Sequence, residues 1–359
     1  MIVEAELRRI LEESEAARNK FTKLRAVLLA DSHYGIGASP TDLVYTENKM
    51  RLLRVQRNAA AVRFNPPLLL VPSLINRYYV LDLLPGRSFA GFLAEQGFDV
   101  YMIDWGEPTH EDRFNGLAYY MDLLHRCART AGLAAGAESL HVLGYCMGGM
   151  FALLYAALHP ERVRNLVLLT APIDQDVEGG VAGIAARANP PDENVDNPRL
   201  IPAREVKSWF EMLAPGSASG PARWMDLWSR LDQDQARLLD VKAMATWMDD
   251  NVAVAGRLMG ELAQLGPGRN GLMYGTVLVG GTPVDLGRVT MPVYSVSAEQ
   301  DGTVPCASAD AVTRVVPHAE VKRLPGGHVG IVAGKAALAL WPAVATWLGE
   351  RSAELAATG

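Results

Sequence analysis

The sequence predicts an α/β fold in which a mostly parallel central sheet is flanked by helices and interrupted by a mainly helical insertion. Apolar runs at 68–71, 99–104, 140–143, 163–170 and 292–297 alternate with segments at helical spacing. Such alternation is typical of parallel sheets covered on both faces. Between 173 and 285 the alternation stops, and four of the chain's seven tryptophans fall there. Because the sheet resumes afterwards, a cap inserted between two strands is favoured over a separate domain.

The same patterns divide the chain into three parts. Residues 1–40 form an N-terminal helical segment, because apolar residues recur at helical spacing among charges over 3–30. Its apolar stripe packs either on the body or on a partner. Residues 41–172 and 286–359 form the core, and residues 173–285 form the cap. Within the core, the further predicted elements are a strand over 45–55 and helices over 88–96, 117–131, 150–158 and 336–348.

Composition and charge exclude several classes of protein. The chain has 359 residues, 49% of them hydrophobic and 21% charged, as expected of a globular protein with a full core. A net charge of −6 argues against a nucleic-acid partner. The three cysteines, Cys127, Cys146 and Cys306, form no metal-spaced cluster, which predicts no disulfide scaffold, no metal site and a reducing compartment. Neither a signal-peptide pattern nor an apolar run long enough to span a membrane is present.

The most specific signal is the stretch Leu-His-Val-Leu-Gly-Tyr-Cys-Met-Gly-Gly-Met over 140–150. An apolar strand enters Gly144-Tyr-Cys-Met-Gly148, and an Ala-rich run follows at helical spacing. This is the context of the nucleophile elbow of α/β-hydrolase folds, here with cysteine where serine is usual. At a helix N-terminus the Cys146 thiolate gains from the helix dipole. We therefore predict that Cys146 is a nucleophile rather than an inert core cysteine.

The remaining members of a catalytic triad follow in the order that this fold uses, which is nucleophile, acid and then histidine. Asp301 lies just past the predicted strand over 292–297, and His328 lies in the glycine-rich loop 324–330. Asp301 could instead be a turn residue before Gly302, and Glu299 is the competing carboxylate. The predicted oxyanion donors are the backbone N–H of Met147 and a second N–H from Ser73 or Leu74, between which the sequence does not choose.

The residues around this elbow resemble polyhydroxyalkanoate synthases, most closely the catalytic subunits of class III. Cysteine inside a lipase-like box is the specific element, and the likeness runs nearly end to end, with 3–30 the least covered part. The residues that carry it are Tyr45–Lys49, Leu52–Arg54, Asn76–Arg77, Tyr79, Asp82, Asp99–Gly106, Gly144–Gly149, Ala157–Pro160, Val163–Leu166, Trp247, Asp249–Asp250, Asn270–Gly271, Gly280–Gly281, Val284–Leu286 and Pro325–Ile331.

The resemblance implies an acyltransferase that polymerises 3-hydroxyacyl-CoA into polyester and releases CoA. Cys146 would carry the chain as a thioester, His328 would deprotonate the thiol, and Asp301 would assist. No cofactor is implied beyond the coenzyme A of the substrate. The partners implied are a second, non-catalytic synthase subunit and a homo- or hetero-oligomer, in the cytoplasm or at the surface of a polyester granule.

Two other functions remain open at this stage. One is a cysteine-dependent α/β hydrolase, either a thioesterase or a polyester depolymerase, in which water is the acceptor. The other is a non-catalytic, granule-associated homologue. The chain also departs from the family pattern: Gly302 stands where His is common, 252–255 lacks a frequent proline, and Met147 stands where Gln is more usual. These departures leave the three predicted catalytic positions intact.

Overall fold

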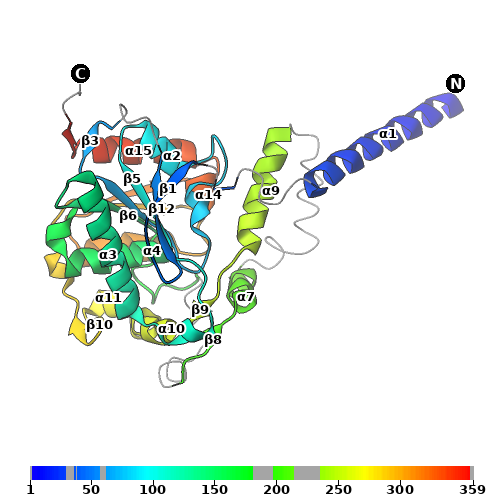
Figure 1. The fold of residues 1–359 in the computed structure, drawn as a ribbon. Helices are drawn as coiled ribbons and strands as arrows, with labels where there is room; N and C mark the ends of the chain where they lie inside the picture. Colours follow the sequence, from blue (N-terminus) through cyan, green and yellow to red (C-terminus); the bar gives the residue numbers. More distant parts are fainter. Residues whose placement is uncertain are drawn as a thin grey trace.

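The computed structural model describes residues 2–29, 36–37, 39–56, 62–180, 197–213 and 235–355. Its centre is an eight-stranded sheet in the order β1-β2-β5-β4-β6-β7-β12-β13, with helices on both faces (Figure 1). The strands of this sheet are β1 (Thr41–Glu47), β2 (Met50–Val55), β4 (Leu68–Val71), β5 (Val100–Asp104), β6 (Leu140–Tyr145), β7 (Val163–Leu169), β12 (Val293–Ala298) and β13 (Glu320–Leu324). The predicted α/β-hydrolase architecture is confirmed.

The sheet is parallel from β5 to β13, and β2 runs antiparallel to both of its neighbours, β1 and β5. The prediction of a single strand over 45–55 was wrong, because β1 and β2 form a hairpin. Asn48, at φ 52°, makes the turn between them. Asparagine tolerates this left-handed backbone better than most residues, so the chain reverses where alternation alone suggested that it continued.

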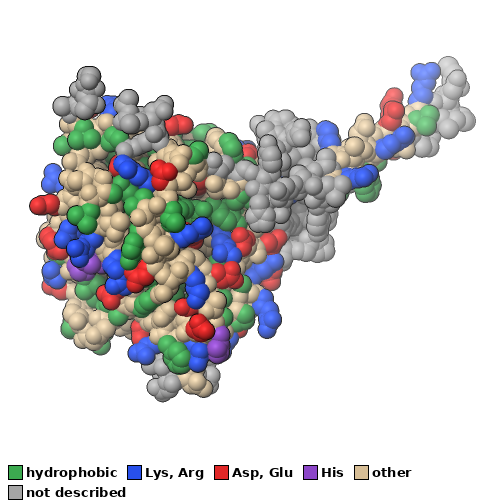
Figure 2. All heavy atoms as spheres, in the orientation of Figure 1, with side chains coloured by type: hydrophobic (Ala, Val, Ile, Leu, Met, Phe, Trp, Pro, Cys, Tyr) green, Lys and Arg blue, Asp and Glu red, His purple; other side chains and the backbone are tan. Residues whose placement is uncertain are grey.

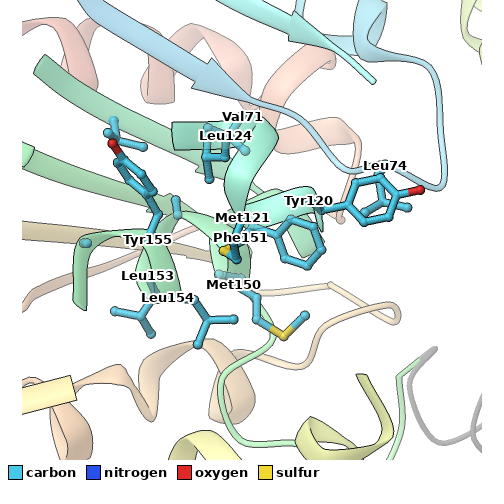
Figure 3. Packing of buried hydrophobic residues seen from close by; sticks show 14 of the residues in the cluster. Val71, Leu74, Tyr120, Met121, Leu124, Met150, Phe151, Leu153, Leu154 and Tyr155 are labelled. Carbon is cyan, nitrogen blue, oxygen red and sulfur yellow. The ribbon is translucent and has the colours of Figure 1, made fainter. Parts of the chain in front are cut away.

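Successive strand residues bury their side chains on opposite faces of the sheet. Leu69 and Val71 of β4 join one core cluster with the helices α3 (Leu117–Ala135) and α4 (Met147–Leu158). Figure 3 shows side chains of these helices, including Leu124 and Phe151, gathered beside Val71. On the other face, the neighbours Leu68 and Leu70 join a second cluster with α2 (Phe89–Glu95) and α15 (Ala337–Gly349). A sheet buried on both faces holds the carboxyl ends of its strands in fixed positions.

Between β7 and β12 the chain leaves the sheet. The described part of this insertion contains β8 (Leu200–Ile201), α7 (Ala203–Leu213), α9 (Gln235–Asp249), β9 (Val254–Ala255), α10 (Gly256–Leu262), α11 (Gly271–Tyr274), β10 (Leu278–Val279) and β11 (Thr282–Pro283). Trp224 and Trp228 lie outside the described residues. The short strands β8 and β9 pair antiparallel with each other, so the segment has its own local structure.

The remaining helices and short strands lie before β4 and after β12 in the sequence. Helix α1 (Ile2–Leu29) matches the helix predicted over 3–30, contacts α9 and runs outward from it, away from the sheet (Figure 1). The others are β3 (Phe64–Asn65), which pairs with β14 (Ala353–Glu354), and the short helices α12 (Cys306–Asp310), α13 (Val312–Val315) and α14 (Gly330–Ala333). In the part of the chain that is described, no helix is long and apolar enough to cross a membrane.

Candidate active site

Cys146 sits at the sharp turn between β6 and α4, with its backbone at φ 57° and ψ −127°. For a residue with a Cβ this conformation is strained, and such strain gathers at functional sites. The turn is tight because Gly144 and Gly148 allow the strand and the helix to approach. A Cβ on Gly148 would collide with the carbonyl oxygen of Val71, and one on Gly144 with that of Gly148. The predicted elbow is therefore present, with the cysteine at its tip.

The structure brings Asp301 and His328 to this cysteine. Nδ1 of His328 lies 2.7 Å from Oδ2 of Asp301, and the imidazole lies close enough to Cys146 for the charge of that side chain to act on it. The other carboxylate oxygen of Asp301 accepts hydrogen bonds from the backbone N–H groups of Thr303 and Val304, both at 2.8 Å. These bonds fix the carboxylate, which in turn orients the imidazole toward the sulfur. The competing carboxylate, Glu299, is exposed.

The electrostatics of the site favour a protonated imidazole. Burial alone lowers the pKa of His328, because the charged ring loses its water. The charge of Cys146 and the hydrogen bond and charge of Asp301 act in the opposite direction and prevail, so that the pKa rises to about 10. The side chain of Asp301 is fully buried and that of His328 is 10% exposed, so water screens these interactions little. These interactions stabilise the protonated imidazole of His328 beside the sulfur of Cys146.

The first turn of α4 contains Met147, whose backbone N–H is predicted from the sequence as an oxyanion donor. Met147 is the first residue of that helix, so its backbone N–H has no acceptor within the helix. The second predicted donor comes from the loop after β4, where Ser73 and Leu74 are both buried. Of that loop, Ile75 lines the cavity beside Cys146. The choice between Ser73 and Leu74 therefore stays a prediction.

A mostly apolar cavity of about 110 Å³ opens beside Cys146 under the cap. Its walls come from the elbow helix, from the cap and from the loop after β12 that also carries Asp301. The residues that line it include Ile75, Cys146, Met147, Met150, Trp209, Met259, Leu262, Thr303, Val304 and Pro305. An apolar acyl group attached to the sulfur would lie among these side chains.

A set of polar contacts, here called the Arg77–Asp250 clasp, ties the cap to the loop after β4. Arg77 Nε lies 3.0 Å from Asp250 Oδ1, and the Tyr79 hydroxyl donates to Asp250 Oδ2 at 2.6 Å. The indole N–H of Trp247 donates to the Arg77 carbonyl at 2.8 Å. Arg77 lies two residues after Ile75 of the cavity wall, so the clasp fixes the loop after β4 against the cap.

We expect Asp250→Asn to lower the free energy of unfolding by about 1–2 kcal/mol, because charge-assisted hydrogen bonds in this partly buried cluster are lost. We also expect kcat to fall about tenfold with little change in KM. A shift of the loop after β4 would move its predicted backbone donor away from the oxyanion without weakening substrate binding. Urea unfolding measures the first effect, and initial rates of turnover measure the second. The matched control is Lys207→Gln, which removes the exposed pair of Lys207 with Asp249. Equal effects of the two variants would contradict the clasp's role.

Some residues of the site carry no distinct signal in the sequence. Tyr145 packs its ring against the imidazole of His328, with centroids 5.3 Å apart, and its hydroxyl donates to the His328 carbonyl at 3.2 Å. The sequence clue to a role for Tyr145 is its position directly before Cys146. Trp209 and Met259 reach the cavity from the cap. Trp209 belongs to an apolar face of α7 at helical spacing, but that pattern indicates burial and does not indicate a place in the cavity. Among the described residues, no group of three His, Cys, Asp or Glu side chains could hold a metal ion.

Comparisons with known proteins agree with this geometry. Residues 66–334 match the family model of the alpha/beta hydrolase fold, and residues 18–93 match that of the poly-beta-hydroxybutyrate polymerase (PhaC) N-terminus. A putative lipase from Acinetobacter baumannii has a similar fold, with a TM-score of 0.54 at 14% identity over 90% of this chain and 95% of that one.

Two curated relatives are much closer in sequence. The poly(3-hydroxyalkanoate) polymerase subunit PhaC of Allochromatium vinosum is 35% identical over 320 residues, which are 88% of this chain and 90% of that protein. Its namesake in Haloferax mediterranei is 33% identical over 332 residues, 89% of this chain and 66% of a longer protein. The chain therefore belongs to the poly(3-hydroxyalkanoate) polymerase family, built on the α/β-hydrolase fold.

Proposed function

We propose that this protein polymerises 3-hydroxyacyl-CoA monomers into a polyester and releases CoA, with Cys146 as the covalent carrier. The observation that carries the proposal is the elbow cysteine beside His328, whose Nδ1 lies 2.7 Å from Oδ2 of Asp301. The named relatives are poly(3-hydroxyalkanoate) polymerase subunits, and this arrangement supplies the parts that acyl transfer to a hydroxyl requires.

In the first step the Cys146 thiolate attacks the thioester carbonyl of the monomer. His328 holds the proton that the thiol has given up, and the carboxylate of Asp301 stabilises the resulting imidazolium. The tetrahedral oxyanion accepts a hydrogen bond from the Met147 N–H. When the intermediate collapses, the bond to the CoA sulfur breaks, the proton passes from His328 to that sulfur, and the acyl group remains on Cys146 as a thioester.

In the second step a 3-hydroxyl group attacks the thioester on Cys146. His328, now neutral, accepts the hydroxyl proton, and an ester bond forms while the thiolate leaves. Cysteine suits this exchange because a thioester donor passes its acyl group to a thiolate near thermoneutrally. The acyl-enzyme therefore stays reactive toward hydroxyls, whereas a serine ester would lie lower in energy and trap the chain.

Exclusion of water decides whether the product is polymer or free acid. Water attacking the acyl-enzyme would end the chain, so the acyl group must be held in a dry site. The apolar walls contributed by Met150, Trp209 and Leu262 support this requirement. We further propose that a second, non-catalytic subunit joins this chain and that the assembly works at the surface of the growing polyester.

Product analysis separates polymerase from hydrolase. Purified protein is incubated with 3-hydroxybutyryl-CoA, released CoA is measured, and the acyl product is identified by gel-permeation chromatography and mass spectrometry. We expect insoluble polyester to account for most of the released CoA. Stoichiometric free 3-hydroxybutyrate without polymer would identify a thioesterase and contradict the proposal. Unchanged CoA release in Cys146→Ala would exclude this site from either reaction.

A further inference from the structure

The indole N–H of Trp209 is a buried hydrogen-bond donor without an acceptor. Trp209 is 1% exposed, and its Nε1 atom forms no hydrogen bond with any residue of the described chain. A buried tryptophan usually finds a partner for this N–H, because an unpaired donor away from water costs free energy. The unpaired N–H of Trp209 is therefore available to a ligand.

The donor belongs to the wall of the cavity beside Cys146. Trp209 lies on α7 of the cap, three residues after the buried Val206, and it lines the same cavity as Cys146. Other described residues with an unpaired buried polar atom lie outside this wall, and they include Ser73, Thr170, Ser295 and Trp347. The place of Trp209 on the wall, and not its unpaired N–H alone, points to a ligand of this cavity.

The other polar side chains of the wall are either paired already or are hydroxyls. The carboxylate of Asp174 pairs with Arg314, and the side-chain amide of Gln175 donates to a backbone carbonyl at 3.2 Å. Thr303 and Ser308 add hydroxyl groups, which can either donate or accept. The indole N–H can only donate, so it favours a ligand with an accepting atom at that point of the wall.

The cavity wall differs from the outer surface of the molecule. Figure 2 shows charged, polar and apolar side chains mixed over the visible face, whereas the cavity wall is mostly apolar. A hydroxyl group that moves from water into such a cavity loses its hydrogen bonds with water unless the wall supplies one. The volume of about 110 Å³ approaches that of a cavity that holds benzene, about 150 Å³. A 3-hydroxybutyryl group has as many heavy atoms as benzene, so on Cys146 it would fill the cavity and touch its walls.

We propose that the indole N–H of Trp209 donates a hydrogen bond to the oxygen at position 3 of the acyl group, which is a hydroxyl in the monomer. This inference rests on the proposed function and names the part of the substrate that the cap wall recognises. The hydroxyl oxygen accepts from the indole and keeps its own hydrogen free. Trp209 thereby distinguishes 3-hydroxyacyl thioesters from plain acyl thioesters, because a plain chain leaves the buried N–H unpaired.

The first test compares two thioesters that differ only in this oxygen, 3-hydroxybutyryl-CoA and butyryl-CoA. The second-order rate constant for release of the first equivalent of CoA is measured for each, and their ratio is the discrimination. We expect Trp209→Phe, which keeps an aromatic ring and removes the N–H, to lower this ratio about tenfold. The matched control is Trp347→Phe, which removes an unpaired buried N–H outside the cavity and should leave the ratio unchanged.

Three outcomes would overturn the inference. An unchanged ratio in Trp209→Phe would mean that the N–H binds water or nothing. A ratio lowered by Ser308→Ala and not by Trp209→Phe would assign the contact to the hydroxyl of Ser308. Failure of 3-hydroxybutyryl-CoA to acylate Cys146 in the wild type would overturn the proposed function as well, whereas the first two outcomes would leave that function standing.

The second test leaves Trp209 in place, so it does not depend on how Trp209→Phe folds. Protein carrying Cys146→Ala and isotope-labelled tryptophan is titrated with each thioester, and the indole N–H signals are followed by NMR. The Trp209 signal is the one absent when Trp209→Phe is added to the same chain. We expect 3-hydroxybutyryl-CoA, and not butyryl-CoA, to move the Trp209 indole proton downfield, as formation of a hydrogen bond does. Equal shifts with the two thioesters would contradict the proposed contact.

Discussion

Replacing Cys146 with alanine is expected to abolish both CoA release and polymer formation, with a loss in kcat of about 10⁴- to 10⁶-fold. The sulfur is the atom that would bond to the acyl group, and nothing in the first turn of α4 could take its place. The fold should survive, because the small alanine side chain relieves rather than adds crowding at the elbow. Initial rates of CoA release, with circular dichroism as the check on folding, measure the change.

The matched control for this variant is Cys306→Ser. Cys306 is also a free thiol and is more exposed than Cys146, and it hydrogen-bonds to the Ala298 carbonyl at 3.0 Å, a contact that serine can keep. Its activity should stay close to wild type. Cys146→Ser is the informative intermediate case, since it should acylate slowly and elongate poorly. Wild-type elongation by Cys146→Ser would contradict the argument that a thioester is needed.

The second large effect is expected for His328→Gln, in which acylation of Cys146 by acyl-CoA should slow by about 10²- to 10⁴-fold. Glutamine preserves much of the volume and can hydrogen-bond to Asp301, but it accepts no proton from the thiol. Stopped-flow release of the first equivalent of CoA measures the step. A burst of normal rate and amplitude would show that another group takes the proton from Cys146.

The same variant also gives a prediction on pH. The pKa of His328 is raised from 6.5 to about 10 in the folded protein, so folding favours the protonated ring. The stabilising contribution of that proton is complete below pH 6.5 and is lost as the pH rises through about 10. Urea unfolding should show wild type losing stability relative to His328→Gln between these values. A stability advantage of wild type over His328→Gln that grows as the pH rises would contradict the prediction.

The core of the fold and the candidate triad could be predicted because each depends on short-range signals. Four-residue apolar strands such as β4, and the glycines around Cys146, constrain their neighbours directly. The chain order of Cys146, Asp301 and His328 is the order of nucleophile, acid and histidine in this fold, and Cys146 and Asp301 each follow a predicted strand. The structure places Asp301 and His328 in contact although 27 residues separate them, because β12 and β13 are parallel neighbours.

Other features could not be predicted because no local pattern encodes them. Strand β13 was missed because Glu320-Val-Lys-Arg-Leu324 is charged and mostly exposed, so it shows no apolar run. The hairpin at Asn48 was missed because one backbone angle, rather than hydrophobicity, reverses the chain. The Arg77–Asp250 clasp joins residues far apart in sequence, and only the folded cap brings them together.

Gly302 stands where the family pattern commonly has histidine, and the structure shows whether the turn after β12 requires a glycine there. A Cβ at this position would meet nothing within 4 Å, and the backbone is not in the left-handed region. The glycine is therefore not required by the turn after β12. The space for a larger side chain beside Asp301 is present, so the candidate triad does not depend on the glycine.

The most direct test of the central claim is intact-protein mass spectrometry of enzyme quenched in acid within seconds of mixing with 3-hydroxybutyryl-CoA, followed by peptide mapping. The account predicts a population carrying one or more 3-hydroxybutyryl units, all attached to the peptide that contains Cys146 and removed by neutral hydroxylamine. CoA release without any acylated protein, or acyl groups attached to another residue, would contradict it.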